Sequence, residues 1–351
     1  MEYQHQNRKV VLILMLLTLI GMVILGTAIG AVKIPPRAVI STLLPHIPGI
    51  GTGLSAGDET GIYQTIIWDL RFPRVLLAGL VGMALALAGT TFQGLFKNPM
   101  ADPHIIGVSQ GASLGASVAM VLGSRLNWTG IVVLPGAAFI GAIGAVVIVY
   151  FLARIERRVP VITLLLAGIA VGTLLSALGS LVIFYSGQQL QSIIYWLMGG
   201  FSGRNWDYVK MVLPYILLGG GIILALAREL NLLLMGEETA QHLGIELETV
   251  KLLLLGAASL LTAAAVSASG IIGFVGLIVP HAVRMLVGPD HRILLPAAAL
   301  VGAIFMIAAD ILARTLLAPS ELPVGIITAL FGAPFFIYLL RRNRKTGLYT
   351  E

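Results

Sequence analysis

The sequence predicts an all-α, polytopic integral membrane protein. Three observations predict this fold: 58% of the 351 residues are hydrophobic, only 11% are charged, and the mean hydropathy is +0.96. A soluble domain carries about 25% charged residues, so this chain lacks the polar side chains needed to cover a globule of its size. A chain of this length has room for about eight to ten spans of roughly 20 apolar residues each.

Apolar runs bounded by charges or turn residues predict about ten transmembrane helices. They cover residues 10–32, 73–93, 105–123, 130–153, 160–184, 208–227, 249–267, 271–287, 293–313 and 324–340. The first run is longer than the apolar part of a signal peptide, so we expect an uncleaved span. The eighth is short and contains Pro280, His281 and Arg284. No segment has the length and polarity of a soluble domain, which predicts one transmembrane domain over residues 1–351.

The distribution of basic residues predicts that both termini are cytoplasmic. An even number of spans places the two termini on one side. With the N-terminus inside, fourteen of the 22 Lys and Arg residues fall on inner loops and ends, including the cluster 341–345. Basic residues punctuate the apolar runs and form no single patch, so nucleic acid is not an expected partner.

Two connections differ from simple loops. Residues 33–71 form a long outer segment rich in Pro and Gly. Residues 228–248 form an inner segment that is polar, acidic and helix-prone, with Gly236 and Gly244 as breaks. A folded inner loop suggests a docking surface for a cytoplasmic partner, and a simple interfacial helix is an equally good interpretation.

Enzyme motifs are absent or better explained by packing. The run from Gly107 to Gly111 matches the G-x-S-x-G pattern, but it opens an apolar helix, where a hydrolase needs a strand–turn–helix corner. Gly107, Gly111 and Gly115 recur every four residues, and Gly168, Gly172, Ser176 and Ser180 form a second small-residue face, as in closely packed membrane helices. The sequence has no P-loop, no H-E-x-x-H zinc motif and no cysteine. Any ATPase must therefore be another chain.

Charged residues within the predicted spans are few. Asp310 is the main acid, and Arg314 follows it at i+4, a spacing that suits a helical ion pair. Ion-coupled transporters usually carry acids or histidines inside their spans, so this scarcity counts against proton coupling. The roles of Asp310 and His281 are left open. Arg71 and Arg74 precede the second span on the outer face, where arginines either mark the interface or serve in docking.

A series of motifs in order along the chain resembles one known family. The motifs are Leu70–Leu76 (LRFPRVL), Gly89–Gln93, Lys97–Pro103 (KNPMADP), Gly107–Ala112, Tyr195–Gly200, Gly236–Ala240 with Leu243 and Gly244, Gly273–His281 (GFVGLIVPH), Ala309–Arg314 and Glu321–Ile326. Together, over about residues 10–340, they resemble the FecCD family, the permeases of type II ABC importers for iron-siderophores, haem and cobalamin.

The resemblance implies a set of partners and site residues. It implies a homodimer of ten-helix subunits, two cytoplasmic ATPase subunits that use ATP and Mg, and an extracytoplasmic binding protein. Arg71, Arg74 and Arg314 match family arginines that meet acidic residues of the binding protein, where they would mostly set docking rate and register. The match to the coupling helices that contact the ATPase comprises Met235, Gly236, Glu237, Glu238, Thr239, Ala240, His242, Leu243 and Gly244.

The cytoplasmic gate is also carried over from the resemblance. Asn98 and Met100 match the inner loop after the second span, and Val161 and Ile162 fall near a second gate position. The cobalamin permease has small hydroxyl residues at that second position, so this chain departs from it and could form a hydrophobic constriction.

The sequence therefore predicts a multi-pass permease of a bacterial or archaeal cell membrane, in contact with lipid. An inner membrane and the single membrane of a Gram-positive cell fit equally well. We expect it to have no catalytic activity, metal site or bound cofactor of its own. Iron-siderophore is the first expectation for the cargo, followed by haem and cobalamin or another corrinoid. A paralogous permease could replace the second copy. The alternatives are an ion-coupled secondary transporter and a membrane-embedded hydrolase that uses Ser109.

Overall fold

The computed structural model describes residues 2–30, 32, 34–46, 63–126, 130–156 and 158–345. Within these residues the regular structure is helical, apart from one isolated bridge between Ile155 and Arg158. The predicted all-α class is confirmed. Residues 47–62 of the predicted outer segment, together with Lys33 and Arg157, lie outside the described residues.

Each of the ten predicted spans corresponds to a helix in the described part of the chain. These helices are α1 (Glu2–Ala28), α4 (Phe72–Leu95), α5 (Val108–Leu126), α6 (Val133–Ala153), α7 (Val161–Phe184), α9 (Trp206–Ala225), α12 (Leu247–Ser269), α13 (Val275–Val287), α14 (His291–Thr315) and α15 (Val324–Lys345). Seven of them, α1, α4, α6, α7, α9, α12 and α14, are long and apolar enough to cross a membrane. The chain is therefore a multi-pass membrane protein.

Shorter elements connect these helices. They are α2 (Pro36–Leu43), η1 (Leu44–His46), η2 (Thr65–Arg71), η3 (Pro103–Ile106), η4 (Gly187–Gln189), α8 (Leu190–Leu197), α10 (Ala227–Leu234) and α11 (Glu237–His242). The π-helix η2 runs directly into α4, so this helical segment begins earlier than the apolar run that predicted it. Hydropathy misses the extension because Asp69 and Arg71 interrupt the apolar residues while the backbone stays helical.

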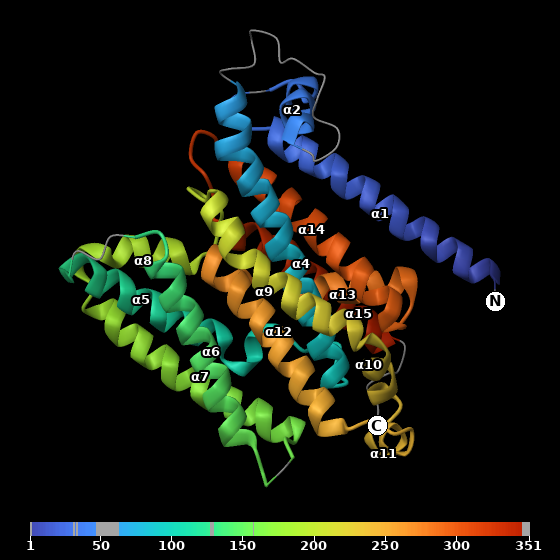
Figure 1. Ribbon diagram of the computed structural model, residues 1–351. Helices are drawn as coiled ribbons and strands as arrows, with labels where there is room; N and C mark the ends of the chain where they lie inside the picture. Colours follow the sequence, from blue (N-terminus) through green and yellow to red (C-terminus); the bar gives the residue numbers. More distant parts are fainter. Residues whose placement is uncertain are drawn as a thin grey trace.

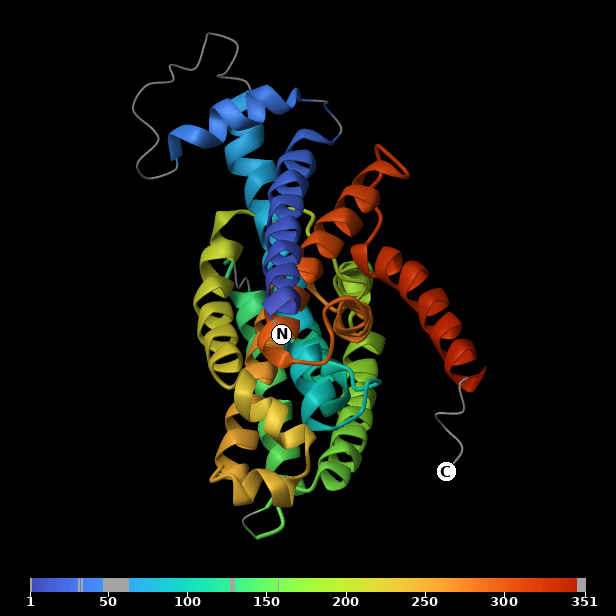
Figure 2. The ribbon, with the colours of Figure 1, turned by 90° about the vertical axis from the view of Figure 1, so that its right-hand side faces the viewer.

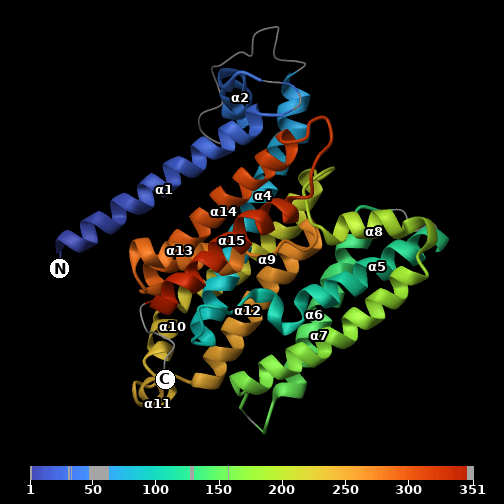
Figure 3. The same cartoon turned by 180° about the vertical axis from the view of Figure 1, so that it is seen from behind.

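Helix α4 lies at the centre of the molecule. In an apolar 18-residue stretch of the span from η2 through α4, 83% of the residues are buried, against 11% for α1 at the periphery. Helix α14 packs along α4, α13 packs against both of them, and α15 contacts α13 and α14 (Figures 1 and 3). Gly82 of α4 faces Gly302 of α14 so closely that a Cβ on either residue would overlap the other's carbonyl oxygen. The two backbones therefore touch, as small residues allow in membrane helices.

Helices α5, α6 and α7 pack on one another as a second group, on the other side of α12. A Cβ on Gly111 of α5 would overlap the Gly141 carbonyl oxygen of α6, which confirms the predicted packing role of the glycine face. Figure 2 shows α2 at one end of the molecule and the α6–α7 connection at the other. We call the α2 end the outer end and the end with α10 and α11 the inner end, following the predicted orientation.

Candidate functional site

A cluster of four charged residues lies at the outer end. Asp310 of α14 accepts hydrogen bonds from Nε and Nη2 of Arg74 at 3.0 and 2.9 Å, and its second oxygen is 3.0 Å from Arg314 Nε. Arg74 Nη1 also donates to the carboxylate of Glu321, at 2.9 and 3.0 Å. We call Arg74, Asp310, Arg314 and Glu321 the outer cluster. The predicted i,i+4 pair of Asp310 and Arg314 is confirmed.

Burial differs sharply within the outer cluster. Asp310 has no exposed surface, and the side chains of Arg314 and Arg74 are 6% and 11% exposed, whereas that of Glu321 is 36% exposed. Burial alone raises the pKa of the Glu321 carboxyl. The hydrogen bond and charge of Arg74, with the Ser202 hydroxyl and the Arg314 charge, outweigh burial, so the pKa lies below its ordinary value. Glu321 is therefore the ionised, partly accessible member of the cluster.

Two of the arginines expected to serve in docking are anchored to backbone carbonyls. Arg71 Nη1 donates to the carbonyls of Thr27 and Ala28, and Arg314 donates to those of Gly26 and Ile29. The last carbonyls of a helix have no partner within it, and cations are favourable at that end. Both arginines thus fix the outer end of α1 against α4 and α14. Both residues are less than 10% exposed.

A cavity of about 350 Å³ adjoins the outer cluster. Arg74 and Glu321 form part of its wall, and α8 and the connection to α9 supply Ser192, Trp196 and Arg204. The indole nitrogen of Trp196 and Nε of Arg204 are buried and have no hydrogen-bond acceptor among the described residues. Donors of this kind are satisfied by water or by a ligand oxygen. The outer end thus has a polar hollow beside the buried ion pairs.

One face of α7 is exposed along its whole length. Ile162, Leu166 and Ile169, at its inner half, are 73%, 62% and 60% exposed. The same face continues through Thr173, Ser176 and Ser180, which are also exposed. The spacing of these six residues alternates between four and three, which keeps them on one side of a helix. This α7 face is apolar at the inner end and carries hydroxyl groups at the outer end.

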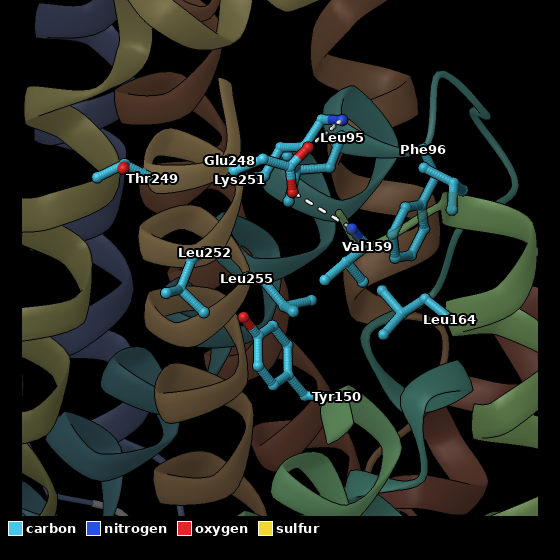
Figure 4. A pocket seen from close by; sticks show the side chains of 11 residues that line it. Leu95, Phe96, Tyr150, Val159, Leu164, Glu248, Thr249, Lys251, Leu252 and Leu255 are labelled. Carbon is cyan, nitrogen blue, oxygen red and sulfur yellow. Dashed lines mark hydrogen bonds and ion pairs between the residues drawn. The ribbon is translucent and has the colours of Figure 1, made fainter. Parts of the chain in front are cut away.

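The two predicted gate segments lie at the inner end and border a common space. The Asn98 side chain accepts a hydrogen bond from the Met100 N–H at 2.9 Å and so closes a turn after α4. Val161 begins α7 after Pro160, and Ile162 follows on the exposed face. Leu95 and Phe96, just before Asn98, line one cavity with Val159 and Val161 (Figure 4). The structure therefore brings the surroundings of both gate segments together.

The predicted coupling segment is folded as two short helices. Helices α10 and α11 are separated at Gly236, with φ of 120°, and α11 ends before Gly244, with φ of 84°. These left-handed positions suit glycine, so the predicted breaks are confirmed. Met235 and Leu243 are 66% and 59% exposed, whereas Ala240 is fully buried. The remaining predicted residues of the segment flank them: Glu237, Glu238, Thr239 and His242 are exposed. The segment presents two apolar side chains among polar ones.

The chain is similar to known permeases over nearly its whole length. The profile described as the FecCD transport family matches residues 15–342. The chain belongs to the FecCD transport family.

Relatives of this FecCD permease differ in the substrate in their names. It is 48% identical to the cobalamin import system permease protein BtuC of Halobacterium salinarum, over 88% of this chain and 83% of that protein. It is 44% identical to the hemin transport system permease protein HmuU of Yersinia pestis, over 80% and 84%. It is 36% identical to the Fe(3+) dicitrate transport system permease protein FecD of Escherichia coli, over 96% and 100%.

A solved structure has the same fold. It is described as a metal-chelate type ABC transporter in an inward-facing conformation, and it superposes on this chain with a TM-score of 0.81 and 34% identity. The match covers 94% of this chain and 98% of that one. The architecture described above is thus the architecture of an ABC importer permease.

The FecCD permease holds Ser109 in a buried polar contact. Its hydroxyl pairs with Nδ1 of His104, whose Nε2 is 3.2 Å from the Ile272 carbonyl oxygen. A carbonyl beside Nε2 accepts its proton, which leaves Nδ1 to accept from the serine. The Asp102 carboxylate instead caps the His104 N–H at 2.8 Å. These contacts tie η3 and the start of α5 to the 270–274 segment, and Ser109 itself is only 4% exposed.

Arg284, which the sequence left without a role, bridges α13 and α4. It donates to Gln93 Oε1 at 3.1 Å, and Gln93 donates to the carbonyl of Gly276 at 3.2 Å. His281 lies on the same helix as Arg284 and is partly buried. Among the described residues, no group of three or more His, Asp or Glu side chains is placed to hold a metal ion.

Proposed function

We propose that this chain forms the translocation path of an ABC importer for a metal chelate, with cobalamin as the first candidate. Among the relatives described above, identity is higher to the cobalamin and hemin permeases, at 48% and 44%, than to the Fe(3+) dicitrate permease, at 36%. This order ranks cobalamin and haem above the iron-siderophore that the sequence alone placed first.

The α7 face is the observation that carries the proposal. In a helix surrounded by lipid, exposed side chains are expected to be apolar, yet Thr173, Ser176 and Ser180 lie together on an exposed face. A water-filled path favours such hydroxyl groups. At the inner end of the same face, Ile162, Leu166 and Ile169 supply the apolar side chains from which a gate that closes by dewetting can be built.

A second copy of the chain completes this path in our proposal. The α7 face is exposed in the part of the chain that the structure describes, and its alternating spacing of four and three residues is typical of a seam between helices. A twofold axis beside α7 would place two such faces across one channel. A homodimer is the simplest arrangement, and a paralogous permease would serve the same role.

Two cytoplasmic ATPase subunits drive the proposed transport, using ATP and Mg that this chain does not bind. Met235 and Leu243 provide apolar contacts for the ATPase, surrounded by the polar residues of α11. The chain itself is then one permease domain of a bacterial or archaeal cell membrane and performs no chemistry.

The proposed binding protein docks at the outer end. The proposed docking residues remain Arg71, Arg74 and Arg314. Because they are largely buried, we expect them to act mainly by holding the outer end in place for the binding protein. Arg74 already neutralises Glu321, so an incoming carboxylate would compete with Glu321 for the same guanidinium. Such contacts tune docking rate and register more than affinity.

The alternative is an ion-coupled secondary transporter. It would need an acid within the spans that can take up and release a cation. Asp310 is held between two arginines instead, which suits an anchor. ATP-driven uptake separates the two functions.

The test is uptake into proteoliposomes that contain the chain and its ATPase, with cobalamin, hemin and ferric citrate as separate probes, each with its binding protein. Uptake that requires internal ATP supports the proposal. The variant Ser176→Trp should block uptake, because the indole would fill the path. Leu178→Trp is the matched control, since Leu178 is exposed on another face of α7. Uptake driven by an ion gradient without ATP would contradict the proposal.

A further inference from the structure

Lys251 joins the coupling segment to the start of α12. Its Nζ is 2.8 Å from Glu237 Oε1 on α11 and 3.6 Å from Glu248 Oε1 on its own helix. The Lys251 side chain is 16% exposed, whereas those of Glu237 and Glu248 are 50% and 39% exposed, so both are partly exposed pairs. A displacement of α11 would therefore pull on Lys251 and, through it, on Glu248.

Glu248 extends this connection to the segment before α7. Its second oxygen, Oε2, accepts a hydrogen bond from the Val159 N–H at 3.3 Å. Val159 precedes Pro160, which fixes its own φ and restricts the conformation of the residue before it. The backbone of Val159 is thus stiffly linked to Val161, the first residue of α7. Figure 4 shows Glu248 pointing from α12 toward Val159.

A cavity of about 160 Å³ lies beside this contact. Leu95 and Phe96, just before the first gate segment, and Val159, Val161 and Leu164, in and beside the second, line it against Tyr150 and Leu255. Closely packed interiors resist displacement, whereas a space next to a segment lets the segment move without expelling its neighbours. The start of α7 can therefore shift toward α12 at little packing cost.

We propose that Lys251 and Glu248 are positioning residues that transmit the movement of α11 to the gate at Val161 and Ile162. This inference rests on the proposed function, since it presupposes an ATPase that moves α11. The chain of contacts runs from Glu237 of α11 through Lys251 and Glu248 of α12 to Val159, just before α7.

A second polar connection leaves the coupling segment in another direction. Asn231 of α10 donates to Asp290 at 2.8 Å and accepts from the His291 N–H at 2.9 Å, so it holds the start of α14. These contacts connect α10 to α14, which packs along α4. The contact through Lys251 is distinct because it ends at the gate segment.

The experiment uses the whole transporter, with its ATPase, in lipid nanodiscs. The chain has no cysteine, so Ile162→Cys gives a single site on this chain for an environment-sensitive fluorophore, attached before assembly. ATP binding should shift the emission of the parent complex. Loss of the ion pairs in Lys251→Met should reduce this shift, measured at saturating ATP, by up to about fivefold, the upper effect of a partly exposed pair. Lys251→Arg should restore it, and Arg292→Met, which removes another inner-end cation, should leave it intact.

Glu248 separates the two halves of the connection. Glu248→Gln keeps an oxygen for the Val159 N–H and weakens only the contact with Lys251, whereas Glu248→Ala removes both. The proposal predicts a larger loss of the emission shift for alanine than for glutamine. Equal losses would contradict the link to Val159.

Three outcomes overturn the inference. The first is an unchanged emission shift in Lys251→Met. The second is a loss of shift and ATP hydrolysis in equal proportion, which would mark a merely structural role. The third is a parent complex whose label does not respond to ATP, which would remove the gate at Ile162. ATP-driven uptake by that same complex would still support the proposed function.

Discussion

Replacement of Asp310 by asparagine should destabilise the folded chain strongly. The buried carboxylate is within 3.0 Å of both Arg74 and Arg314, whose side chains are 11% and 6% exposed. Asparagine has nearly the same volume but no charge, so two buried guanidinium groups would lose their shared counter-ion. Breaking a buried ion pair from one side costs about 3–5 kcal/mol, because the remaining charge is left uncompensated.

Glu321→Gln is the matched control for this prediction. Glu321 contacts the same Arg74, but its side chain is 36% exposed, and in Glu321→Gln the Arg74 guanidinium keeps Asp310 as its counter-ion. An exposed pair contributes about 0.2–1 kcal/mol. The assay is equilibrium unfolding by SDS in mixed micelles, followed by helical circular dichroism, which reports the free energy of unfolding for both variants. Equal unfolding midpoints for Asp310→Asn and the parent would refute the assignment of Asp310 as the buried anchor of the outer cluster.

Three further predictions concern packing, pH and Ser109. Gly111→Ala should lower the free energy of unfolding by about 1–3 kcal/mol, because the new methyl group overlaps the Gly141 carbonyl. The control Gly144→Ala places its methyl group in open space and should be neutral, so equal thermal midpoints for the two variants would contradict this packing. The pKa of Glu321 lies below its ordinary value of 4.5. Its stabilising contribution is therefore complete above pH 4.5 and is lost as the pH falls through the lower folded-state pKa. The free energy of unfolding should fall less steeply with acid in Glu321→Gln than in the parent, and identical profiles would argue against the contact of Glu321 with Arg74. Ser109→Ala should cost about 1 kcal/mol, the loss of one buried hydrogen bond, and should retain uptake; a folded variant without uptake would revive a chemical role for the serine.

Hydropathy and local spacing predicted the features of this protein that depend on residues close together in the sequence. The ten helices follow from apolar runs, the contact of Asp310 with Arg314 follows from i,i+4 spacing, and the breaks at Gly236 and Gly244 follow from the freedom of glycine. Each of these depends on residues within a few turns of one another.

Contacts between distant segments could not be predicted in the same way. Arg74 meets Asp310 across 236 positions, and Arg71 caps the carbonyls of Thr27 and Ala28 some 44 positions away. A basic residue before an apolar run gives no sign of whether it faces water or a helix end. The sequence therefore placed these arginines at the outer end, but it could not predict that Arg71 and Arg314 would be buried there. Helix α8 was not predicted because its eight residues are too few to appear as a membrane span.

The exposed face of α7 could be recognised only from the sequence and the fold together. Its apolar and hydroxyl residues are visible in the sequence, and the small residues Ser176 and Ser180 suggested helix packing. Only the fold reveals that Gly168 and Gly172 are buried while the two serines are exposed. That division turns a predicted packing surface into a candidate wall of the path.

ATP hydrolysis by the reconstituted complex of this chain with its ATPase is the decisive measurement for the importer assignment. Binding proteins loaded with cobalamin, hemin or ferric citrate are added one at a time. We expect one of them to stimulate hydrolysis, and we expect the stimulation to be lost when Arg74 is replaced by Glu, because that change places three carboxylates together at the outer cluster. An ATPase that never associates with this chain, or hydrolysis that no loaded binding protein alters, would contradict the assignment as an ABC importer permease.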